Sequence, residues 1–347
     1  MSTSTLPCTE GDITRGGVAP LEVNDLTTTF VPNGRRIEVV RGVSFTLRRG
    51  ETLMLLGESG SGKSVTARSI MQLYGSAAEL GGSVRMNGQE LLGLPESRLR
   101  GVRGGQIALI PQDPTGALDP LRRIGAQLTE VLAVHGVERV RRAARRRAEE
   151  LLAMVGIPDP KRVADSYPHE LSGGMRQRAV IAIAVACDPQ VLIADEPTTA
   201  LDVTVQAQIL ELLAELRERL GTAVLMVTHD VGVAGDFGGR IGVMYAGRLV
   251  EEGPAGEVLS NPRHPYTRGL LDSLPGPDIP RGTLRSIEGS PPGVGAFPAG
   301  CAFAPRCPVA RPSCHGEDPP LREVAPDRAA ACPVVNPAGP APGEVAS

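Results

Sequence analysis

Several features that mark large classes of proteins are missing from this chain of 347 residues. The longest uninterrupted apolar run, residues 179–187, is about half of the roughly 18 residues that a membrane-spanning helix requires. Residues 1–12 contain neither a basic segment nor an apolar one, so we expect no secretory signal peptide. The net charge is only −3, and the arginines of residues 139–147 are interspersed with alanine, as on a solvated helix face. We therefore expect a cytosolic chain that neither crosses a membrane by itself nor binds nucleic acid through charge.

Lysine is also scarce, and its position is informative. The chain has only two lysines, Lys63 and Lys161, although arginine is abundant. Lys63 lies in G-E-S-G-S-G-K-S, residues 57–64, which fits the phosphate-binding pattern G-x-x-x-x-G-K-[ST], or P-loop. Glycines let backbone N–H groups wrap closely around an anion, and a compact ammonium fits this position better than a planar guanidinium.

The segments around the P-loop support a nucleotide site. The apolar run 52–56 predicts a buried strand before it, and a helix that begins near Lys63 adds positive charge at its N-terminus. Lys63 should reach the β- and γ-phosphates, and the hydroxyl of Ser64 should bind Mg²⁺. The nucleotide-binding residues expected here are Gly57, Glu58, Ser59, Gly60, Ser61, Gly62, Lys63, Ser64 and Val65.

A second apolar run, residues 191–195, predicts a buried strand that ends in two carboxylates. Asp195, at the tip of the strand, can hold Mg²⁺ directly or through water. Glu196 comes next and is placed to polarise an attacking water. Because paired acids after a strand are also common helix caps, this signal gains its weight from the P-loop.

Buried strands alternate with helical segments over most of the chain, which predicts an α/β fold with a mostly parallel sheet covered on both faces. We expect strands at 52–56, 83–88, 106–110, 191–195 and 223–228, and helical segments at 121–156, 177–186 and 203–220. Alternating apolar residues at 21–26 and 37–47 predict a small antiparallel sheet that flanks the nucleotide, with a turn at Asn33-Gly34. Phe30 in this sheet either stacks on a base or belongs to the core.

Composition divides the chain into unequal parts. Beyond Gly253 prolines and glycines become dense and periodicity fades, which indicates a loop-rich extension followed by a disordered tail. The expected parts are a flexible N-terminus at 1–19, a nucleotide-binding domain at 20–253 with a helical insert at about 113–171, a C-terminal extension at 254–333 and a disordered tail at 334–347.

Four further motifs accompany the P-loop and the acidic strand. They are L-S-G-G-M at 171–175, Gln112 after a strand, A-L-D at 200–202 and T-H-D at 228–230. With this order of motifs, the chain resembles the ATP-binding subunits of ABC transporters over roughly residues 20–260. Two positions depart from the family pattern: Thr199 stands where serine is usual, and Pro111 stands where an aromatic residue is frequent. Neither departure removes a catalytic group.

The resemblance implies an ABC-type P-loop NTPase that hydrolyses ATP with Mg²⁺. It implies that Ser172, Gly173 and Gly174 contact a nucleotide held by another subunit, so that two ATP are enclosed in a head-to-tail dimer. It also implies that His229 contacts the γ-phosphate. The implied catalytic residues are Lys63, Gln112, Glu196 and His229, and the implied Mg²⁺ ligands are Ser64, Gln112 and Asp195.

Two motifs in the extension indicate the group within the family. H-P-Y-T-R at 264–268 and C-A-F-A-P-R-C-P at 301–308 are similar to the C-terminal extension of dipeptide and oligopeptide importer ATPases. This implies an energy-coupling subunit on the cytosolic face of the cell membrane. Its implied partners are two polytopic permease subunits, a second ATPase subunit that is identical or related, and indirectly an extracytoplasmic solute-binding protein, with no nucleic acid.

Other functions stay open at this point. Nickel importers share much of the extension, so an importer for nickel or another small solute is an alternative. A soluble ABC ATPase of DNA repair or translation would be expected to carry a long coiled-coil insertion or a second nucleotide domain, and a P-loop kinase would lack L-S-G-G-M. The sequence has the motif and neither addition.

Four cysteines crowd into the extension with the spacing C-x5-C-x6-C-x17-C: Cys301, Cys307, Cys314 and Cys332. In a reducing cytosol such a group indicates metal binding more than disulfides. Four thiolates suit zinc or an iron–sulfur cluster, and the wide gaps lack the paired C-x2-4-C pattern of structural zinc. Because so small a segment can hardly fold on its own core, we expect a structural [4Fe-4S] cluster, with Zn²⁺ as the alternative. The resemblance to the importer extension also favours the cluster.

Overall fold

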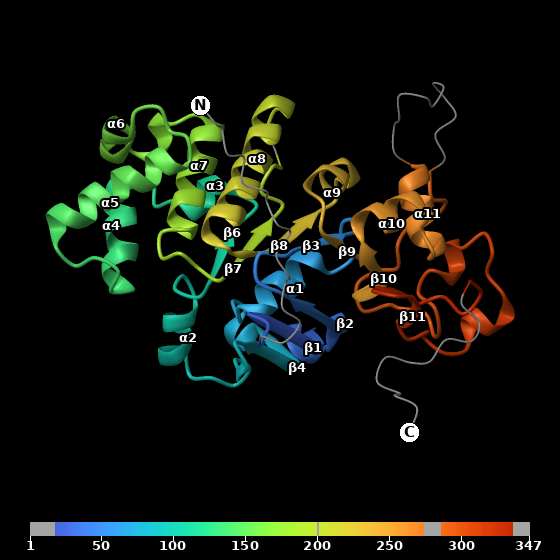
Figure 1. The fold of residues 1–347 in the computed structure, drawn as a ribbon. Coiled ribbons are helices and arrows are strands. Elements are labelled where there is room, and N and C mark those ends of the chain that lie inside the picture. Colours follow the sequence, from blue (N-terminus) through green and yellow to red (C-terminus); the bar gives the residue numbers. More distant parts are fainter. Residues whose placement is uncertain (1–17, 200, 274–285, 336–347) are drawn as a thin grey trace, which may run out of the picture.

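The computed structural model describes residues 18–199, 201–273 and 286–335, and the structural statements below refer to these residues. Most of the expected flexible N-terminus, residues 1–17, and most of the expected disordered tail, residues 336–347, lie outside the described part. Ala200 of the A-L-D motif does so as well. The described chain forms two sheets with helices packed around them (Figure 1).

The main sheet has eight strands in the order β11-β12-β10-β9-β3-β8-β7-β6. The central strands β9, β3, β8, β7 and β6 pair in parallel, whereas β10, β12 and β11 continue the sheet in antiparallel pairs. Their bounds are β3 (Thr52–Leu56), β6 (Ile107–Ile110), β7 (Val191–Asp195), β8 (Ala223–Thr228), β9 (Arg240–Tyr245), β10 (Arg248–Pro254), β11 (Arg322–Ala325) and β12 (Arg328–Ala330). Parallel strands end at one edge of a sheet, so the residues that follow β3, β7 and β8 meet there.

The second sheet is antiparallel, with the order β2-β1-β4-β5. Its strands are β1 (Leu21–Phe30), β2 (Ile37–Leu47), β4 (Ala78–Met86) and β5 (Gln89–Glu90). The expected strand at 83–88 is wrong at both ends, because β4 begins at Ala78, runs through Gly81 and Gly82, and ends at Met86. Gly82 has φ +86° where the pairing with β1 shifts register, a bulge that only glycine accommodates without strain.

The helices lie around both sheets and at one end of the molecule. Their bounds are α1 (Lys63–Ile70), α2 (Glu96–Val102), α3 (Pro114–Ala117), α4 (Ile124–Val134), α5 (Arg141–Met154), α6 (Pro160–Asp165), α7 (Gly173–Ala184), α8 (Val203–Leu220), α9 (Val231–Phe237), α10 (Ala255–Ser260) and α11 (Pro265–Asp272). Short 3-10 turns are η1 (Pro32–Gly34), η2 (Gly75–Ala77), η3 (Pro168–Glu170), η4 (Ala304–Arg306) and η5 (Pro312–His315). The described part contains no helix long and apolar enough to cross a membrane.

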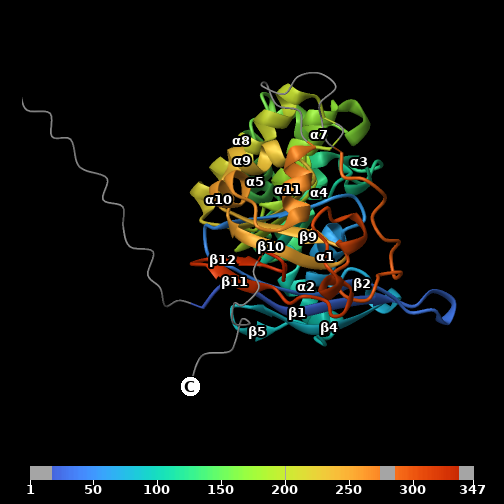
Figure 2. The ribbon, with the colours of Figure 1, turned by 90° about the vertical axis from the view of Figure 1, so that its right-hand side faces the viewer.

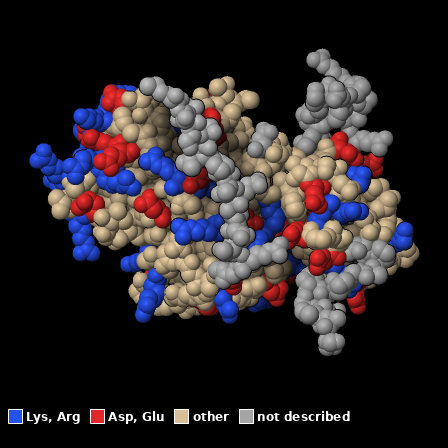
Figure 3. Space-filling model, in the orientation of Figure 1, with Lys and Arg blue, Asp and Glu red and all other residues tan. Residues whose placement is uncertain are grey.

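Helices α4, α5 and α6 pack together at the left end of the view in Figure 1. They contribute apolar residues such as Leu128 and Leu151 to the larger core cluster. Arg141, Arg142 and Arg146 of α5 are exposed and Ala144 and Ala148 are buried, which fits the solvated face expected from the sequence, whereas Arg145 and Arg147 are half-buried. Lys and Arg side chains are prominent on this end of the surface (Figure 3).

The buried apolar residues form two core clusters, one on each face of the main sheet. Met54 and Leu56 of β3 belong to the cluster shared with most helices, whereas Leu53 and Leu55 belong to the cluster shared with the antiparallel sheet. This alternation follows from the two-residue period of a strand. Because both faces are covered, β3 is buried along its whole length, as the sequence predicted.

The C-terminal extension is joined to this core. Strand β12 pairs with β10, which places Ala330 opposite Glu251, and Figure 2 shows β11 and β12 beside β10. Glu251 is fully buried and pairs with buried Arg328 at 2.9 Å, and it also accepts the backbone N–H groups of Arg263 and His264 at 2.8 Å. The extension therefore continues the main sheet and packs on its core, which its lack of periodicity did not predict.

The buried pair Arg328–Glu251 generates a stability prediction. Arg328→Met removes the guanidinium and leaves a buried carboxylate without its partner, so the free energy of unfolding should fall by about 3 kcal/mol. Urea denaturation of the full chain measures this change. Arg36→Met, which breaks the exposed Arg36–Glu79 pair, is the matched control and should cost at most about 1 kcal/mol. Equal losses from the two variants would contradict a stabilising joint between extension and sheet.

Candidate functional site

The candidate site lies where β3 ends and α1 begins. Residues 57–62 turn between them, and Gly57, Gly60 and Gly62 all have positive φ. A Cβ atom at Gly57 would collide with the carbonyl oxygen of Met244, so glycine is required there for packing as well as for backbone conformation. The strand, loop and helix follow one another as the P-loop pattern predicts.

Lys63 is buried at the centre of this loop. Its ammonium donates to the carbonyl oxygens of Gly57 at 2.7 Å and Glu58 at 3.0 Å. Burial lowers the pKa of Lys63, and the nearby carboxylates of Glu196, Asp195 and Glu58 oppose that shift. The loop thus holds a cation next to backbone N–H groups, which is an arrangement suited to a polyphosphate.

The two oxygen groups expected to bind Mg²⁺ meet beside the P-loop. The hydroxyl of Ser64 donates to Oδ1 of Asp195 at 2.6 Å, and Asp195 is fully buried at the end of β7. Arg68 of α1 lies 3.3 Å from the other carboxylate oxygen. A hydroxyl and a carboxylate in contact fit the donor set that Mg²⁺ takes. The third expected ligand, Gln112, donates a hydrogen bond to Glu196 instead of to this pair.

Glu196 brings together two of the predicted residues, Gln112 and His229, and it also contacts Thr199. Its carboxylate accepts from Nε2 of Gln112 at 2.9 Å and from Oγ1 of Thr199 at 3.0 Å, and Nδ1 of His229 lies 3.3 Å away. These residues follow β6, β7 and β8, whose carboxyl ends share one edge of the sheet. Glu196 itself has φ +49°, a strained conformation for a residue with a side chain.

Thr199 contacts Glu196, although the sequence did not identify it as a functional residue. It appeared only as a departure from serine, yet its hydroxyl holds the carboxylate of Glu196. The backbone N–H of Thr199 also donates to the carbonyl of Glu196 at 3.2 Å, which closes a turn. A hydroxyl three residues after an acid is the signal that could have identified it.

The residues Ser172, Gly173 and Gly174 begin helix α7. The hydroxyl of Ser172 accepts the backbone N–H of Met175 at 3.3 Å and caps the helix, which explains why α7 starts before the expected position at Gln177. Within the described residues, no hydrogen bond or ion pair joins this segment to the P-loop. Helices α7 and α1 also lie apart in both ribbon views (Figures 1 and 2).

The four cysteines of the extension come together in space. The backbone N–H of Cys301 donates to the carbonyl of Cys314 at 2.8 Å. Burial raises the pKa of Cys301 to about 11, and the neighbouring thiols of Cys314 and Cys332 add to this shift. Burial and the same two thiols also raise the pKa of Cys307. Nevertheless, no set of three His, Cys, Asp or Glu side chains in the described part is arranged to hold a metal ion.

Comparisons with known proteins agree with this geometry. Residues 40–199 match the family model described as ABC transporter, and residues 250–314 match that of the oligopeptide/dipeptide transporter, C-terminal region. The chain is 49% identical to the oligopeptide transport ATP-binding protein OppD of Mycobacterium tuberculosis over 90% of its length and 51% of that protein. It is 47% identical to the dipeptide transport ATP-binding protein DppD of Lactococcus lactis over 92% of both chains. The chain thus spans about half the length of the mycobacterial relatives that it matches.

A solved structure resembles the same part of the chain. The dimeric structure of a bacterial ABC transporter cassette is 30% identical, with a TM-score of 0.60 over 68% of this chain and 98% of the other. The fold and the family predicted from the sequence are therefore confirmed. The chain belongs to the family of ABC transporter ATP-binding subunits and carries the C-terminal region of the oligopeptide and dipeptide transporters.

Proposed function

We propose that this chain is the ATP-hydrolysing, energy-coupling subunit of an ABC importer for dipeptides or oligopeptides. The convergence of Gln112, Thr199 and His229 on Glu196, next to the Ser64–Asp195 pair, carries the proposal. These groups come from separate strand ends and surround one carboxylate. The named relatives and the match of residues 250–314 support the peptide as substrate class.

The proposed reaction uses this chain's residues as follows. The backbone N–H groups of residues 60–64 and the ammonium of Lys63 bind the β- and γ-phosphates of ATP. Ser64 and Asp195 would hold Mg²⁺, with Gln112 as a third ligand, and the ion would supply positive charge against the phosphates. Glu196 polarises the attacking water, and His229 stabilises charge that develops on the γ-phosphate.

The second half of the composite site is proposed to act on a neighbouring subunit. Ser172, Gly173 and Gly174 offer a hydroxyl and a helix N-terminus, but they make no hydrogen bond to their own P-loop among the described residues. The related cassette is dimeric, which supports a pair of ATPase subunits. In the proposed pair the subunits are arranged head to tail and enclose two ATP. The second ATPase subunit is either a copy of this chain or a relative.

The remaining proposed partners are two polytopic permease subunits and, indirectly, an extracytoplasmic solute-binding protein, with this chain on the cytosolic face of the membrane. The helical insert at about 113–171, within a nucleotide-binding domain of 20–253, would contact the permeases. Two apolar side chains of that insert support this role, because Leu121 is 85% exposed and Val134 is 73% exposed.

The four clustered thiols are proposed to hold a [4Fe-4S] cluster with a structural role, with Zn²⁺ as the alternative. They supply the thiolate donor set of such a cluster. Cys314 and Cys332 are buried and Cys301 and Cys307 are half-buried, and the thiols of Cys314 and Cys332 influence the pKa of both of the others. The described arrangement is not a closed ligand set. The extension at 254–333 also packs on the main core, so the cluster would add to a folded region.

Replacement of the polarising carboxylate tests the proposed reaction. Glu196→Gln should leave ATP binding intact but lower turnover in the assembled transporter by about two orders of magnitude or more, because the water loses its base. It should also trap the ATP-bound dimer. Phosphate release and nucleotide retention measure these effects. Glu218→Gln, at an exposed site of α8, is the control, and near-normal hydrolysis by Glu196→Gln would reject the assigned role.

Obstruction of the second anion site tests the composite arrangement. Ser172→Arg should leave ATP binding to the isolated chain largely unchanged, because the P-loop lies in a separate part of the fold, while hydrolysis by the assembly is abolished. Equilibrium binding and ATPase assays separate the two effects. If the isolated variant lost affinity as severely as Lys63→Ala, Ser172 would act within its own chain and the head-to-tail model would fail.

Iron content tests the proposed cluster. Anaerobically purified chain should be brown, with a broad charge-transfer absorption band and about four iron atoms per chain. Cys314→Ser should lose most of this iron, whereas Cys187→Ser, outside the cysteine group, should retain it. Colourless protein with one zinc per chain would show that the cysteines hold zinc and not the cluster. Metal-free protein with four freely alkylated cysteines would reject both metals.

A further inference from the structure

The C-terminal extension makes direct polar contacts with the second residue of the P-loop, Glu58. The guanidinium of Arg306 donates to both carboxylate oxygens of Glu58, at 2.9 and 3.2 Å. The phenol oxygen of Tyr266 accepts the backbone N–H of Glu58 at 2.9 Å. Tyr266 lies in α11 and Arg306 lies in η4, so two separate segments of the extension hold one P-loop residue by its side chain and its backbone.

Both residues of the extension are held firmly. The side chain of Arg306 is only 6% exposed, and it also donates to the carbonyl oxygen of Glu288 at 3.0 Å and to the phenol oxygen of Tyr245 at 3.3 Å. Tyr266 is fully buried. A guanidinium with this many partners has one orientation, and a bidentate pair of this kind is directional as well as attractive.

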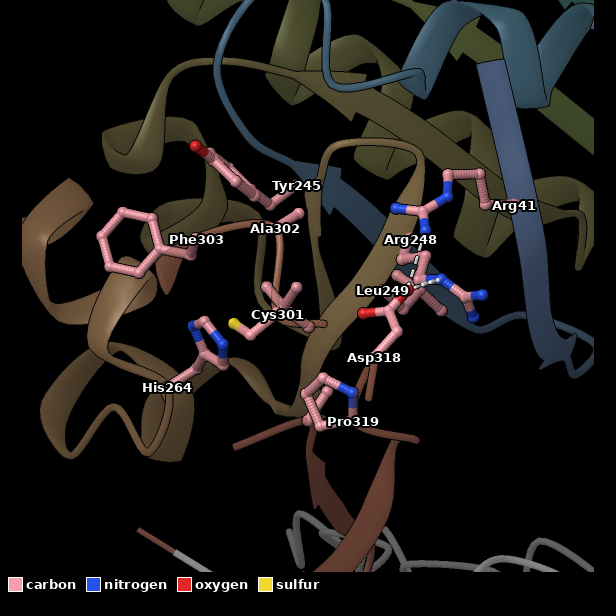
Figure 4. A pocket seen from close by; sticks show the side chains of 12 residues that line it. Arg41, Tyr245, Arg248, Leu249, His264, Cys301, Ala302, Phe303, Asp318 and Pro319 are labelled. Carbon is pink, nitrogen blue, oxygen red and sulfur yellow. Dashed lines mark hydrogen bonds and ion pairs between the residues drawn. The ribbon is translucent and has the colours of Figure 1, made fainter. Parts of the chain in front are cut away.

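Three aromatic side chains pack together next to these contacts. The rings of Tyr245 and Tyr266 are 4.5 Å apart, and Phe303 lies 5.4 Å from each of them. In Figure 4, Phe303 and Tyr245 lie on the same side of a small cavity as Cys301. With a volume of about 20 Å³, the cavity is too small for an organic ligand. The aromatic rings therefore act as packing that fixes Tyr266 and the segment bearing Arg306.

The charge of Glu58 matters because it lies within the field of Lys63. The carboxylate of Glu58 is one of three that favour the charged form of Lys63. A bound polyphosphate would be attracted to the same ammonium and repelled by the same carboxylate. With Arg306 in a bidentate contact, the charge of Glu58 is balanced, and the P-loop presents its cation to the phosphates.

We propose that Arg306 and Tyr266 are positioning residues of the nucleotide site, through which the C-terminal extension completes the P-loop of its own chain for ATP. Tyr266 fixes the backbone at Glu58, and Arg306 neutralises its carboxylate. This inference rests on the proposed ATP-binding function. It assigns the extension a direct role in nucleotide affinity, in addition to any role in holding a metal.

Removal of the guanidinium tests the proposal in the full chain. Arg306→Met should weaken ATP binding about tenfold, because the carboxylate of Glu58 is then unbalanced beside the phosphates. The loss of affinity should be smaller for AMP, which lacks the β- and γ-phosphates. In the double variant Glu58→Gln/Arg306→Met the offending charge is gone, so ATP affinity should return to within about threefold of the unchanged chain. Calorimetric titration measures all of these constants.

A matched control separates this effect from general damage to the extension. Asp318 is 23% exposed, close to the 26% of Glu58, and it also joins the extension to the rest of the chain. It pairs with Arg41 at 2.9 Å and Arg248 at 2.7 Å, as Figure 4 shows. Asp318→Asn weakens two ion pairs of the same joint, neither of which includes a P-loop residue, so its ATP affinity should stay unchanged.

Each outcome bears on one of the two proposals. If the unchanged chain does not bind ATP, the proposed function fails. If it binds ATP but Arg306→Met binds equally well, or the double variant stays as weak as the single one, the positioning role is overturned. Should Arg306→Met fail to fold by circular dichroism, Glu58→Gln alone decides. About threefold tighter ATP binding supports the charge argument, and unchanged or weaker binding overturns it.

Discussion

The P-loop holds a buried ammonium, Lys63, and most of the site can be understood as the means of keeping that charge there. Burial disfavours the charged form of Lys63, and three carboxylates favour it. Those acids come from the P-loop itself and from the end of β7, so the balance depends on β3 and β7 ending at one edge of the sheet, with β8 between them. A fully buried Asp195 is in turn tolerable because Ser64 and Arg68 contact it.

The same geometry explains the strain at Glu196. A side chain at φ +49° persists only where its surroundings hold it, and three polar groups from different segments contact this carboxylate. Gln112 follows β6 and His229 follows β8, so a movement of either segment would change the hydrogen bonding of Glu196. The proposed base is therefore connected to the segment that begins the helical insert.

Much of the central fold could be predicted because its signals are local. Strand β7 and helix α8 have the predicted bounds, since continuous apolar runs and the capping residue Asp202 define them. Strand β4 was misjudged because its glycines interrupt an apolar pattern while permitting a bulge. The candidate residues near Glu196 were identified from motifs, but the contact with Thr199 depends on a turn that the pattern does not specify.

The contacts of the extension were beyond prediction for a different reason. Arg306 and Glu58 are separated by 248 positions in the chain, and no periodicity links residues so distant. What joins them is the addition of β12 to β10 and the burial of Arg328 against Glu251, which place the extension beside β10, the strand next to β9. Once the extension is part of the sheet, its loops lie within reach of the P-loop, which follows the neighbouring strand β3. An acidic residue in a phosphate-binding loop then benefits from a counter-charge, and Arg306 of the C-terminal region provides one.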